Sequence, residues 1–439
     1  MKKALHWFSN DLRLEDNSTL SALIEKADCI AFVYVIDPRD FKPNNYHHQP
    51  IGKHRWRLIS DSLRQLDKQL QNKGHQLTIL HGHPEMLITK LVTSHHIDLL
   101  GYNKPVGLHE RQRWQTVQQA VAYTECISES DNTLFTEAQL SLEEKHFTSF
   151  SQFRKRVEKM AIEPFLARPL TTLPACLELA ENETTSIAWQ ALSPISDNGH
   201  IFSGGELTAK AHLKQYFSGA LPSSYKQTRN ALSGWHNSTK MSHFLALGNL
   251  SARQIWQQLK HYEKQIQKND STYWIGFELL WREYFQYLAL KLKAQLFAFK
   301  GNASTAPMTS FFAERFQKWC QGNTPFALVN ACMHELNATG YISNRGRQIV
   351  ASCLVNELGI DWRFGAAYFQ QQLVDYDVAT NWGNWQYIAG VGADPRGGRH
   401  FNIEKQTAQF DPHKAFITQW QGEVRQSELD SIDITDWPI

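Results

Sequence analysis

The first 130 residues of the chain alternate short apolar runs with longer amphipathic stretches. The apolar runs predict strands at 4–8, 29–36, 76–80 and 98–101, and the amphipathic stretches predict helices near 17–26, 53–72, 84–94 and 109–122. Strands that alternate with helices are typical of a parallel, doubly wound, Rossmann-like sheet. Such sheets bind ligands beyond the carboxyl ends of their strands, but the first of those loops, 9–17, has no G-x-G-x-x-G sequence. We therefore predict an α/β domain without a Gly-rich dinucleotide site in that loop.

The strand pattern disappears after residue 203, and long helical patterns follow near 206–217, 251–267, 274–294, 325–339, 345–358 and 361–373. Ser203 and Glu206 have the spacing of a capping box at the first of these helices. Residues 131–202 contain four prolines and predict a long connection. We therefore expect an α/β domain over 1–130, an interdomain connection over 131–202 and a larger all-helical domain over 203–439.

Composition excludes several classes of protein. The net charge is +2, so any nucleic-acid site must be a local patch. The six cysteines have no C-x-x-C spacing, which predicts reduced thiols and no zinc or iron–sulfur motif. The apolar stretches stop well short of the ~20 residues of a membrane span, and the N-terminus does not resemble a signal peptide. We expect a cytoplasmic monomer that binds no metal and no membrane.

Residues 343–401 mix aromatic and charged side chains closely. The aromatic members include Trp362, Trp382, Trp385 and Tyr387, and the polar members are Asn344, Arg345, Arg347, Asp375, Asp377, Asn381, Arg396 and Arg399. Aromatic rings can stack and relay electrons, carboxylates and amides bind the edges of heterocycles, and arginines bind phosphates. An aromatic helical core with a charged rim is the alternative, but the stretch is too polar for that. It predicts a flat, redox-active ligand beside a polyanion.

Two helical patterns present polar side chains on one face. Glu278, Trp281 and Arg282 stand at i, i+3 and i+4, and Asn344, Arg347 and Gln348 repeat the spacing. The alternative for the first set is a surface ion pair beside a buried Trp, but two such faces predict two walls of one pocket.

Two further groups of residues extend this pocket. Asp375 and Asp377 lie two residues apart and need a cationic partner such as Arg347, unless they form a solvated acidic loop. The hydroxyls and cations at 225–230 and 238–242 suit the binding of a pyrophosphate. The alternative is that these residues only cap helices.

Together these pieces resemble the photolyase/cryptochrome flavoprotein family over nearly the whole chain. WFSNDLRLEDN at 7–17 is similar to the family's opening strand and loop, and ELLWRE at 278–283 and NRGR at 344–347 are similar to its central motifs. SNRGRQ at 343–348 and NWGNWQYIAGVGADPR at 381–396 are most similar to the DASH cryptochrome branch.

The resemblance implies a U-shaped FAD in the helical domain. The residues implied to bind it are Tyr225, Ser238, Thr239, Lys240, Met241, Ser242, Arg282, Arg347, Asp375, Asp377 and Asn381. Those at 225 and 238–242 hold the phosphates and the ribityl chain. Arg347 paired with Asp375 flanks the isoalloxazine, Asp377 lies near its polar edge, and Asn381 faces N5.

The resemblance also implies light-driven splitting of cyclobutane pyrimidine dimers in DNA. Glu278 and Asn344 are implied to hydrogen-bond the flipped dimer, Trp281 and Tyr387 to pack on it, and Gln348 to line the same cavity. Many duplex-acting photolyases have Met at the position of Gln348 and Trp at that of Tyr387. A more polar pocket recovers less energy from a flipped lesion, and flipping costs least for a base already in a single strand. We therefore expect a preference for single-stranded DNA.

The remaining implied sites are the electron-transfer residues, the site of a light-harvesting antenna and the contacts to DNA phosphates. Trp385 and Trp362 match the inner members of the family's photoreduction chain. At the third position of that chain this sequence has Thr309, and Trp319 is a nearby substitute. The alternative is that these indoles simply belong to the core. Glu110 matches the position at which relatives bind the antenna 5,10-methenyltetrahydrofolate, and a Glu that starts a helix is otherwise a dipole partner. Candidate phosphate contacts are Arg229, Lys240, Arg345, Arg396, Arg399 and Lys405.

Two other functions remain open. A blue-light receptor would bind FAD and signal without repairing DNA. A flavin oxidoreductase active in darkness would bind no nucleic acid, but the absence of a Gly-rich nicotinamide site and the presence of Arg396 and Arg399 weigh against it.

Overall fold

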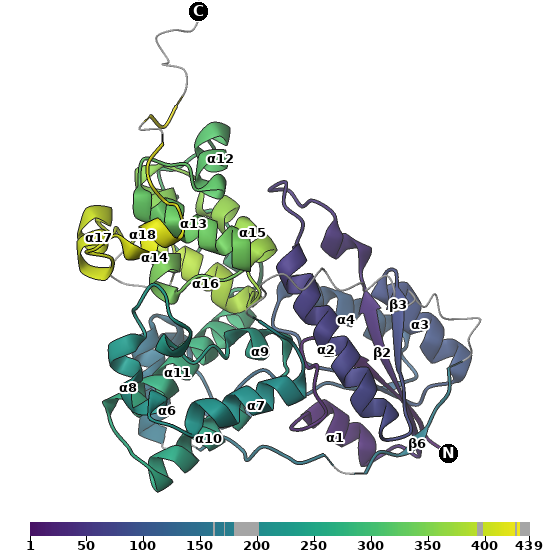
Figure 1. The fold of residues 1–439 in the computed structure, drawn as a ribbon. Helices are drawn as coiled ribbons and strands as arrows, with labels where there is room; N and C mark the ends of the chain where they lie inside the picture. The colour runs from purple at the N-terminus through teal and green to yellow at the C-terminus, as the bar shows by residue number, and fades with distance from the viewer. Residues whose placement is uncertain (161–162, 171, 180–201, 393–397, 426–427, 431–439) are drawn as a thin grey trace, which may run out of the picture.

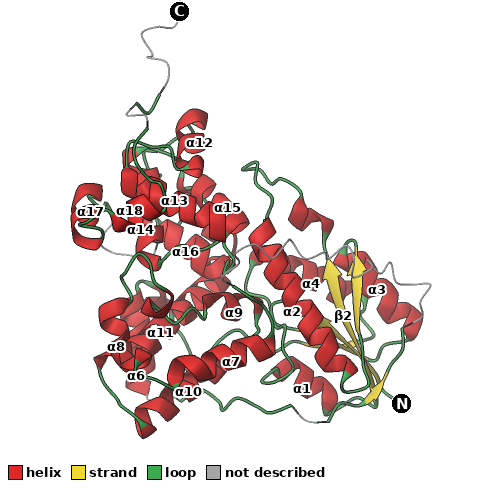
Figure 2. Cartoon of the chain, in the orientation of Figure 1, coloured by secondary structure: helices red, strands yellow, loops and turns green. Residues whose placement is uncertain are grey.

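The computed structural model describes residues 1–160, 163–170, 172–179, 202–392, 398–425 and 428–430. An α/β part, purple to blue in Figure 1, lies beside a helical part that runs from teal to yellow. All the strands lie in the first part, and helices make up most of the second (Figure 2). The predicted fold class, an α/β domain followed by a larger helical domain, is confirmed.

The α/β part is built on one parallel sheet. Its strands are β1 (Lys3–Phe8), β2 (Cys29–Ile36), β3 (Leu77–His81), β4 (Leu99–Tyr102), β5 (Glu125–Ile127) and β6 (Ala175–Cys176). The order is β3-β2-β1-β4-β5, with β6 paired to the start of β2. The four predicted strands are present to within one residue at each end. The last two strands were not predicted because they are too short to carry an apolar run.

Helices cover both faces of this sheet. On one face lie α1 (Ser18–Ile24) and α2 (Lys53–Gln71), and on the other lie α3 (Pro84–His95) and α4 (Leu108–Ala120). Alternate residues of β2 therefore enter different cores, with Phe32 on the side of α1 and α2 and Val33 on the side of α3 and α4. Strands buried on both faces are nearly continuous apolar runs, as the sequence CIAFVYVI of β2 is.

The helical part encloses a single large core. Its helices are α7 (Glu206–Phe217), α8 (Leu221–Thr228), α9 (Ser242–Leu247), α10 (Ala252–Gln265), α11 (Asp270–Leu292), α12 (Ala313–Gln321), α13 (Ala327–Thr339), α14 (Asn344–Ser352), α15 (Trp362–Gln372), α16 (Val378–Ile388), α17 (Ile403–Phe410) and α18 (Ala415–Gln419). All six predicted long helices are present, and the one predicted over 345–358 consists of α14 and a following π-helical turn, Cys353–Glu357.

Part of the predicted connection also belongs to this core. Among its described residues it contains the α-helices α5 (Glu137–Leu140) and α6 (Phe150–Met160). Phe150, Phe153 and Val157 of α6 are buried among residues of the helical part. The domain limits at 130 and 203 stay a prediction, but α6 packs as a member of the helical part.

The predicted capping box at α7 is wrong. The N-cap of α7 is Gly205, with φ 103° and no side-chain cap. Glu206 instead reaches the loop after β1, where its carboxylate accepts the N–H groups of Leu14 (2.9 Å) and Glu15 (3.1 Å). The spacing matched the motif, but the carboxylate satisfies backbone donors of the other part of the molecule.

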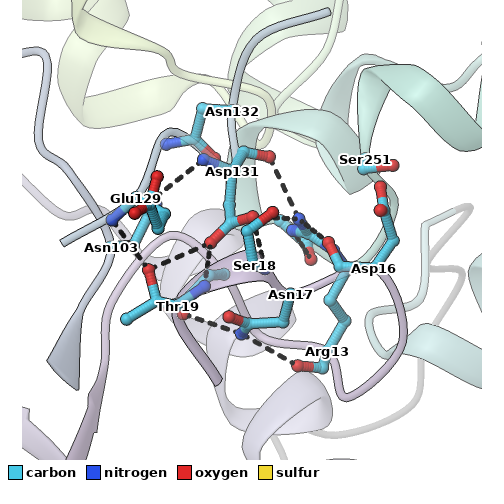
Figure 3. Close-up of polar contacts among 12 residues, drawn as sticks. Arg13, Asp16, Asn17, Ser18, Thr19, Asn103, Glu129, Asp131, Asn132 and Ser251 are labelled. Carbon is cyan, nitrogen blue, oxygen red and sulfur yellow. Dashed lines mark hydrogen bonds and ion pairs between the residues drawn. The ribbon is translucent and has the colours of Figure 1, made fainter. Parts of the chain in front are cut away.

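A buried ionic network joins the two parts (Figure 3). Arg253 of α10 binds Asp16 (Nε to Oδ2, 2.9 Å) and Asp131 (3.2 Å). Arg13 donates to the carbonyl oxygens of Asp16 (2.8 Å), Asp131 (3.0 Å) and Gly248 (2.9 Å). Asp131 also accepts the N–H of Ser18 at 2.7 Å. All four charged side chains are buried, so these partners offset the cost of removing their charges from water.

The turn between α9 and α10 packs against the loop that follows β1. Gly248 has φ 71°, and a Cβ there would meet Asn10 O at 2.0 Å. Asn249 donates to Leu12 O (3.0 Å), and its amide oxygen accepts the Ser62 hydroxyl (3.1 Å). Protein atoms thus fill the space beside the loop in which a doubly wound sheet often binds a ligand.

None of the helices formed by the described residues is long and apolar enough to cross a membrane. Among the same residues, His, Cys, Asp and Glu side chains form no group that suits a metal ion.

We expect Arg253→Met to lower the free energy of unfolding by about 3–5 kcal/mol, because it leaves two buried carboxylates without their cation. Denaturant unfolding followed by tryptophan fluorescence measures this loss. The matched control is Lys104→Met, which breaks an exposed ion pair with Glu137 (3.0 Å) and should cost less than about 1 kcal/mol. Equal losses in the two variants would contradict the importance of the network.

Candidate cofactor and substrate cavity

The helical part contains a cavity of about 590 Å³. Its walls come from α8, α9, α11, α14 and α16 and from the loops before α9 and α16. Most of the residues singled out in the sequence line it: Tyr225, Arg229, Ser238, Thr239, Lys240, Met241, Ser242, Glu278, Trp281, Arg282, Asn344, Arg347, Gln348, Asp375, Asp377, Asn381, Trp385, Tyr387 and Arg399. The two predicted polar helix faces therefore do meet at one cavity.

Arg347 of α14 forms an ion pair with Asp375 at 2.9 Å, the pairing that the sequence predicts. A second bond, from Arg347 Nε to Ile342 O (3.0 Å), fixes the guanidinium. Burial alone would raise the pKa of Asp375, but the charge and the hydrogen bond of Arg347, together with smaller contributions from Ser242 and His243, outweigh it and hold the pKa below its ordinary value. The carboxylate is therefore charged, and its Oδ1 is buried with no hydrogen-bond partner among the described residues.

Asp377 lies at the N-terminus of α16 and is held from two sides. It caps the helix by accepting Thr380 N–H at 2.8 Å, and it accepts Gln286 Nε2 with both oxygens (2.9 and 2.8 Å). Arg282 approaches it at 3.8 Å. Sequence reasoning missed Gln286, although its position four residues after Arg282 continues the polar face of α11.

The loop before α9 gathers hydroxyls and a cation. Lys240 has φ 52°, and its ammonium donates to the Ser238 hydroxyl (3.1 Å) and to the Tyr341 hydroxyl (3.2 Å). A side cavity of about 80 Å³ adjoins this loop and is lined by Arg229, Lys240, Ser343 and their neighbours. Such donors suit phosphate oxygens. Tyr341 was missed because no motif marks it; its ring lies 4.6 Å from the Lys240 ammonium.

A second ion pair closes one side of the cavity. Arg229 of α8 lies 2.5 Å from Glu278 of α11, and its guanidinium covers the ring of Trp274 at 4.6 Å. Burial raises the pKa of Glu278, and the charge of Arg229 opposes part of that rise. Trp274 also lines the cavity and was not predicted.

Aromatic rings hold Trp281 in a fixed orientation. Phe150 of α6 stacks on it with 3.7 Å between ring centroids and 14° between planes. Tyr387 of α16 meets it edge to face at 6.0 Å. The Tyr387 hydroxyl accepts a hydrogen bond from Arg399, whose guanidinium also covers the Tyr387 ring at 5.0 Å. Phe150 was missed because only tertiary packing brings α6 to this wall.

Each of the predicted electron-transfer residues has another indole as a ring neighbour. Trp385 lines the cavity, and its ring centroid lies 6.2 Å from that of Trp319, which is fully buried. Trp362 lies 5.8 Å from Trp382. Gly365 of α15 makes room for Trp385, because a Cβ there would meet the indole at 2.3 Å.

Other predicted residues lie outside the cavity lining. Arg345 donates to Asn230 (3.2 Å) and covers the ring of Phe410 at 4.7 Å. Lys405 is an exposed residue of α17, and Arg396 lies outside the described residues. Glu110 lies in the first turn of α4, and its carboxylate fills the space that a Cβ on Gly107 would take, with Val378 of α16 beside it.

Comparisons with known proteins agree with this geometry. Residues 4–174 match the family model described as DNA photolyase, and residues 274–437 match the FAD binding domain of DNA photolyase. Cryptochrome DASH of Idiomarina loihiensis is 46% identical over 434 residues, which is 98% of this chain and 95% of that protein. Cryptochrome DASH of Vibrio parahaemolyticus is 44% identical and covers 100% and 98% of the two chains. The crystal structure of a Synechocystis cryptochrome aligns with a TM-score of 0.88 at 36% identity, over 96% of this chain and 88% of that one.

The chain belongs to the photolyase/cryptochrome family of flavoproteins. The cryptochrome DASH proteins of Idiomarina loihiensis and Vibrio parahaemolyticus match it over nearly their whole length.

The cavity suits the FAD that this family's domain binds. It offers the unpartnered Asp375 Oδ1 and a cluster of hydroxyls beside Lys240. The side-chain N–H of Asn381 donates to Ala366 O at 3.0 Å, which leaves its amide oxygen as an acceptor. Apolar residues such as Leu245, Ile255 and Phe369 complete the walls. Phosphate, ribityl and ring contacts can thus be made by residues already in place.

We expect Asp375→Asn to lose FAD during dialysis, because the substitution removes the charge that holds Arg347. Absorbance near 450 nm per mole of protein measures retention. Since the ion pair depresses the pKa of Asp375, the native protein should lose FAD only as the pH falls through that depressed value. The control Asp361→Asn breaks a similar ion pair, with Arg363 (2.8 Å), outside the cavity lining. Retention equal to that of the control would contradict the assigned role.

Proposed function

We propose that the protein repairs cyclobutane pyrimidine dimers in DNA under blue or near-ultraviolet light and prefers single-stranded DNA. The observation that carries this proposal is the shared cavity. The residues that we assign to the lesion line the same space as the residues that we assign to FAD. The lesion residues are Glu278, Asn344, Trp281 and Tyr387. A lesion and a flavin bound there lie close enough for an electron to pass between them.

Glu278 and Asn344 recognise the edge of a flipped pyrimidine. A charged carboxylate accepts the ring N–H of thymine, and a side-chain amide both donates to a carbonyl oxygen and accepts. In the free protein Glu278 is paired with Arg229, so lesion binding replaces or shares that ion pair. Arg229 then contacts a phosphate of the strand, as do Lys240, Arg345, Arg399 and Lys405; Arg396, outside the described residues, is a further candidate.

Trp281 and Tyr387 stack against the lesion, with Gln348 beside them. Phe150 fixes the plane of Trp281 before the lesion arrives, so little side-chain freedom is lost on binding. Tyr387 and Gln348 are polar and recover less stacking energy than Trp and Met. Because flipping a base out of a duplex costs a few kcal/mol, such a pocket favours lesions that are already unpaired.

FAD would be the cofactor of this reaction: bound and reduced, it would on excitation lend the electron that opens the cyclobutane ring, and that electron would return to the flavin once the ring has split, so the reaction has no net redox change. Arg347, with Asp375, would offer a positive charge beside the isoalloxazine. Asp377, held by Gln286, would bind its polar edge, and Asn381 would face N5. Ser238, Thr239, Lys240, Met241 and Ser242, together with Tyr225 and Arg282, hold the phosphates and ribityl chain.

Trp385, Trp319 and Trp362 serve the reduction of the bound flavin. Trp385 is the innermost, since it lines the cavity, and Trp319 is its ring neighbour at 6.2 Å. This contact supports Trp319 as a substitute for the ring that is lacking at Thr309.

A folate, 5,10-methenyltetrahydrofolate, is the antenna that we propose for Glu110. The carboxylate lies between the two parts of the molecule, near Gly107 and Val378. Asp40 and Arg55 are also close enough for their charges to interact with it. A pterin ring has the donors that a carboxylate binds.

We expect the purified holoprotein to repair a dimer in a single-stranded oligonucleotide under light, faster than in a duplex. Glu278→Gln should lower repair about ten- to hundredfold, because it removes a charged hydrogen bond worth about 1.5–3 kcal/mol. Since burial raises the pKa of Glu278, native repair should decline as the pH falls through the raised value, whereas the variant should lack that decline. The control Glu125→Gln changes an exposed carboxylate of the α/β part.

Three outcomes of this assay would contradict the proposal. Equal rates on single strands and duplexes would remove the strand preference. A flavin that responds to light without any repair by the native protein would favour a blue-light receptor. Steady consumption of NAD(P)H in darkness would favour an oxidoreductase.

We expect Trp385→Phe to slow photoreduction of the bound flavin strongly, because phenylalanine fills part of the same space but is far harder to oxidise than an indole. Transient absorption after a blue flash measures the rate. The control Trp114→Phe removes a buried indole from the α/β part. A native rate in Trp385→Phe would exclude this indole from the route.

A further inference from the structure

Helix α6 has a strongly basic outer side that the proposed site does not use. Its sequence, FSQFRKRVEKM, carries four cations and one carboxylate in 11 residues. Phe150, Phe153 and Val157 turn into the helical core, whereas Lys155 and Lys159 are exposed. The helix therefore presents an excess of positive charge to solvent.

This basic side is continuous with the cavity. Phe277 and Trp281 line the cavity, and both contact α6: Phe150 stacks on Trp281 and meets Phe277 edge to face at 5.1 Å. The guanidinium of Arg154 covers the ring of Phe277 at 5.5 Å. A strand that leaves the cavity past Phe277 thus meets Arg154 of α6 next, and the exposed Lys155 and Lys159 belong to the same helix.

An exposed aromatic ring stands at the junction. Tyr273, in the first turn of α11, is 45% exposed. Its hydroxyl donates to Glu158 of α6 (2.8 Å) and accepts from Arg154 (3.4 Å), so two hydrogen bonds fix the hydroxyl end of the ring. A rigid, exposed ring beside cations is the arrangement with which proteins bind single-stranded nucleic acid, because every base offers a face to stack.

We infer that α6 and Tyr273 bind the single-stranded DNA that flanks the lesion. Lys155, Lys159 and Arg154 contact its phosphates, and a base stacks on Tyr273. This inference rests on the proposed function and adds a surface outside the lesion cavity. Single-stranded DNA is the favoured occupant because the faces of paired bases are covered by their neighbours in a duplex. An 11-residue helix is about 16 Å long, the length over which one strand of B-form DNA carries about five phosphates.

The test compares two single-stranded oligonucleotides that contain one dimer. The short one has a single nucleotide on each side of the lesion, and the long one has six. In the double variant Lys155→Glu/Lys159→Glu, two phosphate contacts are lost. Each contact on a single strand contributes about 0.7 to the slope of log affinity against log salt, so the slope for the long oligonucleotide should fall by about 1.4. Binding of the short oligonucleotide should not change.

Tyr273 is tested separately. Tyr273→Ala should weaken binding of the long oligonucleotide by about tenfold, whereas Tyr273→Phe, which keeps the ring, should stay close to native. The charge control is Lys68→Glu/Lys73→Glu, which reverses two exposed lysines of the α/β part. All variants are measured as holoproteins, with FAD content and repair of the short oligonucleotide as checks of folding.

The possible outcomes separate this inference from the proposed function. A native slope and native affinity in both the lysine and Tyr273→Ala variants would overturn the α6 surface, even with repair of the short oligonucleotide intact. Failure of the native protein to repair the short oligonucleotide would overturn the proposed function itself. If the charge reversal lowers FAD content, the milder Lys155→Gln/Lys159→Gln variant is measured instead. The same fall in the slope of log affinity against log salt then supports the α6 surface, and a native slope overturns it.

Discussion

The ion network of Arg13, Asp16, Asp131 and Arg253 is the contact on which the rest of the structure depends. It places four buried charges where the sheet, the segment after β5 and α10 meet. Directly after this segment, the N–H groups of Leu134 and Phe135 donate to Glu283 of α11 (2.9 and 3.0 Å). Since α11 also carries Glu278, Trp281 and Arg282, the network sets the position of one cavity wall relative to the α/β part. An uncompensated buried charge is costly, so there are few alternative arrangements.

Paired charges also hold the side chains of the cavity in place. Arg347 is paired with Asp375, Arg229 with Glu278, and Arg282 approaches Asp377, so each charge that faces the ligands has a partner in the free protein. Such pairs hold their side chains in place before a ligand binds, which reduces the entropy lost on binding. Two of these pairs also differ in how they respond to pH. Arg347 keeps the pKa of Asp375 low, whereas burial raises the pKa of Glu278, so the second pair is the one sensitive to pH.

Sequence patterns predicted the helices and strands, whose residues are close together in the chain, but they missed contacts between residues that are far apart in the chain. The apolar run of β2 and the 3.6-residue pattern of α7 reproduce the observed elements, because burial on two faces or on one face leaves a periodic trace. Two sets of predicted site residues line the cavity because their i, i+3 and i+4 spacing places each set on one helix face: Glu278, Trp281 and Arg282, and Asn344, Arg347 and Gln348. Most of the other site residues were predicted from the family resemblance. Glu206 was misassigned because its carboxylate binds a loop about 190 residues away, and Phe150 was missed because nothing in α6 signals its contact with Trp281.

The most direct test of the central claim is a crystal structure of the holoprotein with a single-stranded oligonucleotide that contains one thymine dimer. The account predicts a bent FAD beside Arg347 and Asn381, and the dimer in the same cavity against Trp281 and Tyr387. A flavin bound elsewhere, or a dimer bound on another face of the protein, would contradict it.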